Sequence, residues 1–146
     1  MTDEIYSLRI PVPVNSRGTA LWMNANHSYA RWERARRVKA WRETTVLHAR
    51  AARLPRGLER VRITALLTFE TRRKRDEANY HTTLKPIIDG LGPNRSRITK
   101  SGTHISAPGH GLIPDDTPEH LDGPHIRISQ VLGKPSVLLT IREVTA

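Results

Sequence analysis

Residues 58–69 have the sequence Leu-Glu-Arg-Val-Arg-Ile-Thr-Ala-Leu-Leu-Thr-Phe, and this stretch decides the fold. Val61, Ile63, Ala65 and Leu67 recur at every second position, with charged or hydroxyl side chains mostly between them. A period of two is typical of a β-strand with one buried face. We therefore expect a strand over residues 58–69, and it is the clearest strand of the chain.

A strand and a long helix are expected before it. Residues 5–12 end in Pro-Val-Pro and predict a short edge strand that leads into a loop. Residues 28–52 contain neither Gly nor Pro and predict a helix with Ser28 as its N-cap. Helical spacing puts Arg31, Arg34 and Arg42 on basic faces. The expected buried stripe consists of Ala35, Val38, Trp41, Thr45, Ala49 and Ala52.

A second helix and two strands are expected after it. Leu84, Ile87, Ile88 and Leu91 have helical spacing, with Pro86 in the first turn or at a kink. Residues 92–112 are rich in Gly, Pro and Ser and form a loop that is long for a compact domain, so it is functional or mobile. Strands are expected at 125–131 and 136–144. This order predicts one α/β (α+β) domain over residues 1–146, with a mixed sheet of about four strands and two main helices.

The positive charge lies in one block of the sequence. The 146 residues carry a net charge of +10, and residues 31–75 hold 15 Lys and Arg against four Glu. Such a block indicates a phosphate-binding surface, although a solvated helix face is the alternative. RNA, DNA and an anionic surface all fit the charge. Trp22, Trp32 and Trp41 are candidates for stacking on bases, but Trp41 is better explained as a core residue.

Other classes of protein are disfavoured by composition. Without cysteine the chain has no disulfides and no thiolate metal sites. No apolar run approaches the ~18 residues of a membrane span, and the acidic start is not typical of a signal peptide. We expect a cytoplasmic protein. The low hydrophobic content of 37% favours oligomerisation.

Several carboxylates follow the basic run 72–75 and suggest metal chemistry. Asp76 would lie at a strand end, while Lys85 and Asp89 would share one face of the second helix. Asp115 and Asp116 would close the site if the intervening loop folds back. Mg²⁺ takes oxygen ligands, and phosphodiester hydrolysis uses a metal-activated water with a nearby cation.

Each of these features also has a structural explanation. Asp115 and Asp116 would cap a turn, Lys85 and Asp89 would form a surface pair at i,i+4, and Asn79 would be a helix N-cap. The histidines lack metal-ligand spacing, so a zinc site is not expected.

Three segments together resemble the signature of RusA-type endodeoxyribonucleases. They are Arg-Arg-Lys-Arg-Asp-x-x-Asn (72–79), Leu-Lys-x-x-x-Asp-Gly-Leu (84–91) and Gly-Leu-Ile-Pro-Asp-Asp (111–116). The family signature is R-R-R-D-x-D-N, then L-x-K-x-x-x-D-A-L, then G-hydrophobic-x-D-D. Residues 8–13 are similar to the family's opening strand, and residues 22–42 are similar to phage-borne members. The resemblance implies a small, dimeric, Mg²⁺-dependent Holliday junction resolvase, with Mn²⁺ able to substitute.

The resemblance also assigns roles to residues. It implies that Asp76, Lys85 and Asp116 are catalytic, and that Asp76, Asp89, Asp115 and Asp116 are the candidate metal ligands. It predicts branched DNA, a four-way junction, as the partner of a homodimer in the cytoplasm of a bacterium or a phage-infected host. The expected DNA-binding residues are Arg72, Arg73, Lys74, Arg75, Asn79, Arg31, Arg34, Arg95, Arg97 and Lys100.

The chain departs from the signature at three points. Ala78 replaces the second carboxylate of the first segment, the spacing from Asn79 to Lys85 is longer than usual, and residues 92–111 are an insertion. Ala78 motivates an alternative, a branched-DNA-binding protein with impaired catalysis. An RNA-binding module fits the charge but does not explain the ordered carboxylates.

Overall fold

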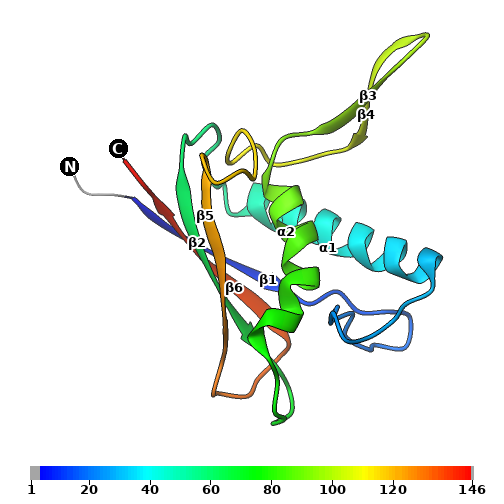
Figure 1. Ribbon diagram of the computed structural model, residues 1–146, viewed down its shortest axis with the longest axis vertical. Helices are drawn as coiled ribbons and strands as arrows, with labels where there is room; N and C mark the ends of the chain where they lie inside the picture. Colours follow the sequence, from blue (N-terminus) through cyan, green and yellow to red (C-terminus); the bar gives the residue numbers. More distant parts are fainter. Residues whose placement is uncertain (1–3, 146) are drawn as a thin grey trace.

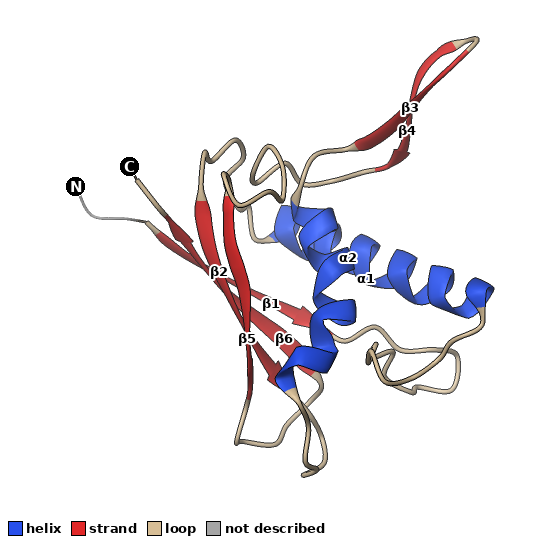
Figure 2. Cartoon of the chain, in the orientation of Figure 1, coloured by secondary structure: helices blue, strands red, loops and turns tan. Residues whose placement is uncertain are grey.

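A four-stranded mixed sheet with two helices on one face forms the body of the computed structural model, which describes residues 4–145 (Figures 1 and 2). The predicted class, α+β with about four strands and two main helices, is confirmed. The elements are β1 (Ile5–Pro11), α1 (Arg31–Ala51), β2 (Val61–Thr68), the 3₁₀-helix η1 (Glu77–Tyr80), α2 (His81–Leu91), β3 (Arg95–Thr99), β4 (Gly102–Ala107), β5 (Leu121–Ile128) and β6 (Ser136–Glu143).

The sheet has the strand order β1-β6-β2-β5. β6 pairs antiparallel with both β1 and β2, whereas β2 and β5 are parallel. The four predicted core residues of β2 are fully buried, and β1 is an edge strand as expected. Parallel neighbours need a long crossover connection. Here the crossover contains α2, which packs beside α1 on the same face of the sheet (Figure 2).

β5 begins and ends earlier than predicted. The expected strand was 125–131, but the observed strand runs from Leu121 to Ile128 and includes Pro124. Proline donates no hydrogen bond to a sheet, so its presence argues against a strand. β5 lies at the edge of the sheet, where a missing donor is tolerated, and this position is not visible in the sequence.

α1 is shorter than predicted and buries a shorter stripe. It starts at Arg31 after Ala30, and Ala30 makes no side-chain capping bond, so the prediction of Ser28 as N-cap is wrong. Ala35 is exposed because the first turns of α1 project past the sheet (Figure 1), and Ala52, the C-cap of the helix, is exposed as well. Its buried residues are Trp41, Arg42, Thr45, Val46 and Ala49. Arg42 was expected on a basic face, and its burial corrects that prediction.

The three tryptophans have different environments. Trp41 is a core residue, fully buried with its indole Nε1 donating to the carbonyl oxygen of Leu21 at 2.8 Å. Trp22 is half-buried beside Trp41 and Phe69. Trp32 is exposed, so of the three it is the one available to stack on a base.

α2 buries the four predicted residues Leu84, Ile87, Ile88 and Leu91. Pro86 is the sixth residue of α2 and lies beyond the first turn. Of the two predicted positions, the first turn or a kink, the first is therefore wrong. The helical backbone begins earlier than the apolar stripe indicates, because η1 leads directly into α2.

The predicted loop 92–112 contains a hairpin. β3 and β4 pair antiparallel as a separate two-stranded sheet that projects away from the body (Figure 1). Sequence periodicity did not reveal these strands because almost every residue in them is exposed. A strand without a buried face has no reason to alternate apolar and polar residues.

The base of this hairpin is firmly attached to α2. The Gly109 N–H donates to Asn94 Oδ1 at 2.9 Å, and the next three N–H groups donate to carbonyl oxygens of residues 90–92. Gly109 has no space for a Cβ, which would collide with the backbone oxygens of Gly92 and Pro93. Both ends of the hairpin are therefore fixed to the C-terminal end of α2. No helix within residues 4–145 has both the length and the apolar character that crossing a membrane requires.

Candidate active-site cleft

Lys85 lies at the centre of the candidate site. Its Nζ is 2.7 Å from Asp116 Oδ2 and 3.2 Å from Asp89 Oδ1. Asp89 is one turn further along α2, whereas Asp116 comes from the loop that precedes β5. The loop folds back toward α2, which was the condition for Asp116 to reach the site. Asp89 and Asp116 therefore both contact the ammonium group of Lys85.

The close contacts perturb the acid–base properties of this group. The hydrogen bond to Asp116 is the main cause that raises the pKa of Lys85 above its usual value, and the contact with Asp89 adds to it. The same hydrogen bond lowers the pKa of Asp116. Near neutral pH the site therefore holds a protonated Lys85 beside an ionised Asp116.

These residues line a cleft of about 310 Å³ at the C-terminal end of α2. Arg95, the first residue of β3, places its Nη2 3.8 Å from Asp89 Oδ2. The charged residues that line the cleft are Arg42, Lys85, Asp89, Arg95, Asp115 and Asp116. A cleft with three cations beside carboxylates suits a phosphate group together with a divalent metal ion.

Arg42 lines the cleft, although it was not among the site residues predicted from the sequence. The residue is 8% exposed, and its Nε donates to the carbonyl oxygen of Pro108 at 3.2 Å. Its buried Nη2 has no hydrogen-bond partner within the described part of the chain. Burial, and then repulsion from Arg95, lower the pKa of Arg42. A buried, unpaired guanidinium donor is costly, and such donors are often kept for a ligand.

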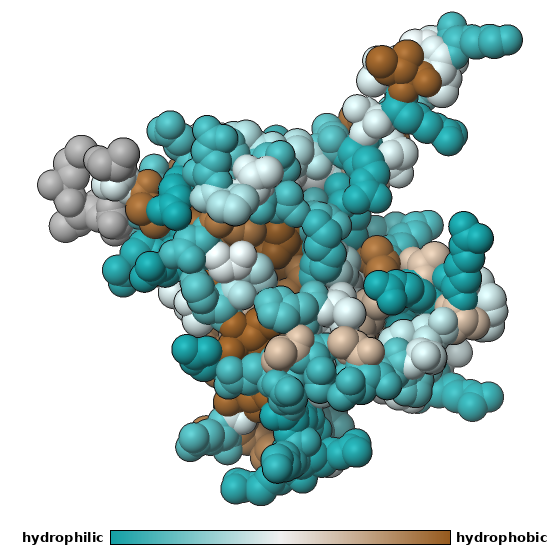
Figure 3. All heavy atoms as spheres, viewed as in Figure 1, coloured by the Kyte–Doolittle hydropathy of each residue, from teal (hydrophilic) through white to brown (hydrophobic). Residues whose placement is uncertain are grey.

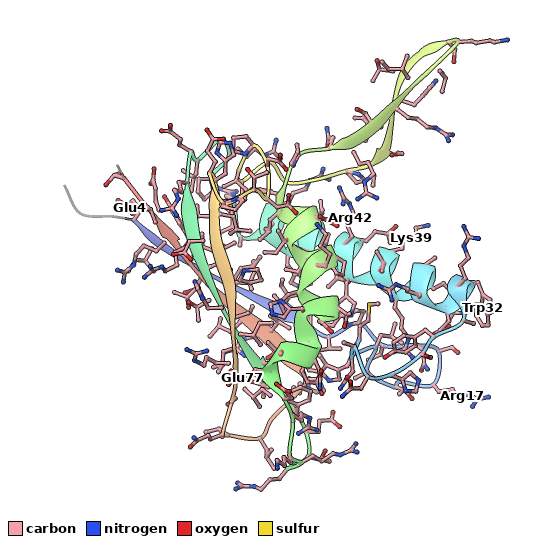
Figure 4. All side chains as sticks on the ribbon, in the orientation of Figure 1. Glu4, Arg17, Trp32, Lys39, Arg42 and Glu77 are labelled. Carbon is pink, nitrogen blue, oxygen red and sulfur yellow. The ribbon has the colours of Figure 1, made fainter. Side chains whose placement is uncertain are left out.

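A glycine explains how Arg42 reaches the cleft. A Cβ at Gly90 would lie 3.1 Å from the carbonyl oxygen of Arg42 and 3.2 Å from Cβ of Thr45. The absent side chain lets α2 approach α1 closely at this point. The side chain of Arg42 lies between α1 and the hairpin base, as Figure 4 shows. A signal was present in the sequence, since position 42 flanks the stripe formed by Val38, Trp41 and Thr45.

Asp76 lies apart from this cleft. Its Oδ1 accepts a hydrogen bond from the N–H of Ala78 at 3.0 Å, which caps η1. It lines a separate hollow with Lys74, Arg75 and neighbouring residues, at the end of α2 opposite to the hairpin base; Glu77, labelled in Figure 4, marks that end. Of the hydrogen bonds and ion pairs found among residues 4–145, none joins Asp76 to the cleft. Its role as a metal ligand stays a prediction.

Asn79 is not the N-cap of α2, the structural role considered for it. Asn79 belongs to η1, whose N-cap is Asp76, and the N-cap position of α2 is Tyr80. The carbonyl oxygen of Asn79 accepts from the N–H of Ala25 at 2.9 Å. Its backbone thereby ties η1 to the segment between β1 and α1.

The four predicted metal ligands do not form one cluster. In the region that the structure describes, no three His, Cys, Asp or Glu side chains converge as a metal site would require. Asp89 and Asp116 are the pair that converges, while Asp115 lines the same cleft and accepts from the N–H of Asp116 at 2.8 Å. Mg²⁺ in nucleotide-processing sites is commonly held by one or two carboxylates, with waters and phosphate oxygens completing the shell. The pair fits that donor set.

A second hollow adjoins the cleft. It has a volume of about 250 Å³ and lies between α2 and the start of β5, with His81 and Leu121 among its lining residues. Lys85 and Asp116 line both hollows. The ion pair therefore lies between the two hollows and lines both.

The predicted DNA-binding residues are distributed over three places. Arg72, Arg73 and Lys74 are exposed in the loop after β2, whereas Arg75 stacks on the Phe69 ring at 3.8 Å. Arg31 and Arg34 are exposed beside Trp32, at the far end of α1 in Figure 4. Arg97 and Lys100 are exposed on the hairpin, and Arg95 lines the cleft.

Comparison with known proteins gives no assignment. Neither a scan against protein-family models nor a search of curated proteins finds a match to this sequence. The class defined by the fold and the site is thus an α+β domain with a cleft lined by three basic and three acidic side chains.

Proposed function

We propose that the chain is a Mg²⁺-dependent endodeoxyribonuclease that cuts branched DNA such as a four-way junction, as its resemblance to the RusA type implies. The observation that carries this proposal is the convergence of Asp89 and Asp116 on Lys85 inside a cleft that arginines also line. Surface i,i+4 pairs do not explain it, because Asp116 comes from a distant loop. The order of the carboxylates and the lysine in the sequence supports the same function.

The metal ion would be held by Asp89 and Asp116. When bound, it supplies charge neutralisation at the scissile phosphate and an activated water, and Mn²⁺ serves in its place. Lys85 lies between the two carboxylates, and Arg95 is a second cation near Asp89. Arg42 and Arg95 add positive charge at the wall, which favours a phosphate group in the cleft.

The DNA would be held by the basic surfaces outside the cleft. The loop 72–74, the start of α1 and the hairpin together provide exposed cations for phosphates that flank the cut. A two-fold dimer would carry two clefts, and paired nicks across a four-way junction need two symmetric sites. The setting would be the cytoplasm of a bacterium or a phage-infected host.

Cleavage of a labelled synthetic four-way junction tests the proposal. We expect symmetric nicks with Mg²⁺ or Mn²⁺, and no nicks with EDTA or with the Asp116→Asn variant. The matched control is Glu43→Gln, which changes an exposed carboxylate of an ion pair that lies outside the cleft. A linear duplex of the same sequence should be cut far less.

A second function is favoured by specific observations. Ala78 replaces a carboxylate of the signature, and Asp76 does not line the cleft. A branched-DNA-binding protein that has lost cleavage would show both features. Tight junction binding without nicks, at every concentration of either metal ion, would establish this alternative and refute the nuclease.

A further inference from the structure

The β3–β4 hairpin is a ribbon with two chemically different faces. Figures 1 and 3 show it standing clear of the body, with apolar atoms displayed between hydrophilic ones. Ile98 pairs with Thr103, and Ser96 pairs with Ile105. Paired residues of a ribbon share a face, as do residues two apart along a strand. The two isoleucines are therefore diagonal neighbours on one face.

This apolar face has no cover. The side chain of Ile98 is 87% exposed and that of Ile105 is 61% exposed. Neither residue belongs to the core of the body, and the hairpin base is already held by backbone hydrogen bonds. Two exposed, bulky apolar side chains that lie outside the core are better explained by a role in binding than by packing.

The rest of the ribbon selects an anionic partner. Arg97 pairs with His104 on the opposite face, Lys100 lies in the turn, and Arg95 begins the first strand. Residues 95–107 contain no Asp or Glu. A ribbon with cations on one face and at its tip matches a polyphosphate chain, and a two-stranded ribbon is of a size that a DNA groove admits.

We propose that the ribbon is a wedge for branched DNA. Ile98 and Ile105 would insert between base steps at the branch point, while Arg97 and Lys100 contact the flanking phosphates. Proteins that kink DNA use exposed Ile, Leu or Phe in this way and lose some stacking energy in doing so. That loss is smallest where bases are already unstacked, as at a branch. This inference rests on the proposed function, since it takes branched DNA as the partner.

The wedge is connected to the candidate cleft through its base. Arg95 is both the first residue of β3 and a wall of the cleft, and Arg42 bonds to Pro108 just after β4. A DNA strand parted at the isoleucines would therefore pass toward Lys85 along a path lined by arginines. The wedge gives the protein a way to favour branched over linear DNA that does not depend on base sequence.

Fluorescence of 2-aminopurine placed at the branch point of a four-way junction tests the wedge, measured with saturating full-length protein in EDTA. Unstacking raises this fluorescence, and we expect a several-fold rise with the unaltered protein. The Ile98→Ser/Ile105→Ser variant should lose most of the rise and only a small part of the affinity. The matched control is Val131→Ser, because Val131 is 75% exposed but lies outside the ribbon. This control should behave as the unaltered protein.

The other outcomes are distinguishable. A full fluorescence rise with the double variant overturns the wedge, and so does tight junction binding by the unaltered protein without any rise; both leave the nuclease proposal standing. Loss of dimers in light scattering, with the rise retained, assigns the apolar face to a second copy of the chain and also overturns it. If the unaltered protein does not bind the junction, the proposed function fails and the wedge fails with it.

Discussion

Arg42 on α1 donates from Nε to the carbonyl oxygen of Pro108 at 3.2 Å, so one buried guanidinium joins a helix of the body to the base of the hairpin. Its Nη2 has no partner among the described residues. An unsatisfied buried donor costs about 1–3 kcal/mol, whereas a typical hydrogen bond contributes about 1 kcal/mol. In the free protein Arg42 is thus held at a net cost, which a phosphate in the cleft would remove.

Arg42→Met tests this interpretation. The variant keeps an apolar stem but loses the bond to Pro108 and the unpaired donor, so we expect the free energy of unfolding to change by no more than about 1 kcal/mol or to rise. Affinity for a four-way junction should fall. Urea unfolding and a fluorescence-anisotropy titration measure the two effects. The exposed Arg36 of α1 supplies the control Arg36→Met. Destabilisation by several kcal/mol would mean that Nη2 is paired in solution.

Lys85→Met tests whether the lysine occupies the place of a metal ion. Removing the ammonium takes away the one cation that contacts both Asp89 and Asp116 and leaves only Arg95 near Asp89, so the added net negative charge should raise the affinity for Mn²⁺ several-fold. Cleavage should be lost nonetheless. Calorimetric titration with Mn²⁺ measures the affinity, with Lys39→Met as control because Lys39 pairs with Glu43 on the exposed side of α1. Unchanged or weaker Mn²⁺ binding would contradict the assignment of these two carboxylates.

The basic run 72–75 should divide into two kinds of residue. Arg72 and Arg73 are exposed, so Arg72→Ala/Arg73→Ala should lower the slope of log affinity against log salt by roughly 0.9 for each phosphate that is no longer neutralised, with unchanged stability. Arg75 stacks on Phe69 and bonds to the Thr71 carbonyl. Arg75→Ala should instead lower the free energy of unfolding by about 1 kcal/mol. Binding titrations at several salt concentrations and urea unfolding separate them; equal behaviour would refute the division.

Asp122 should make stability depend on pH. Its Oδ2 accepts from Arg62 Nε at 2.7 Å, and this bond, followed by that to His125, holds the pKa of Asp122 below its usual value of 3.8. The stabilising contribution is therefore present above 3.8, the value expected in the unfolded chain, and is lost as the pH falls through the lower folded value. Asp122→Asn should be destabilised at neutral pH, and urea unfolding at a series of pH values should show the difference shrinking in strong acid. A difference that grows in acid would show that the pKa is raised.

The sequence predicts elements best where one face is buried. The alternation in β2 and the stripe in α2 were predicted correctly because their core residues recur at the period of the element. The hairpin was not predicted, since Ile98 and Ile105 face solvent and impose no such pattern. The bounds predicted for β5 were displaced because Pro124 is tolerated only in an edge strand. Which strand lies at the edge depends on the whole fold and is not visible in the local sequence.

The candidate site was likewise predicted only in part. Helical spacing alone predicts that Lys85 and Asp89 are neighbours, whereas Asp116 reaches them only if the intervening loop folds back, which helical spacing does not determine. Arg42 escaped prediction because its burial depends on Gly90 of the other helix and on the Pro108 carbonyl. Such contacts are set by how two helices and a hairpin base meet, which local sequence does not specify.

The attachment of the hairpin base to α2 fixes the distance between the tip of the ribbon and the cleft. Because backbone bonds from residues 110–112 fix the ribbon to the C-terminal end of α2, the separation between its tip and the cleft is set by strand length. Removing two residues from each strand would shorten the ribbon by roughly 7 Å. That is about two nucleotide steps of roughly 3.4 Å along a strand. Ribbon length would then fix how many nucleotides separate the branch from the nick, and a trimmed ribbon would move the nick toward the branch.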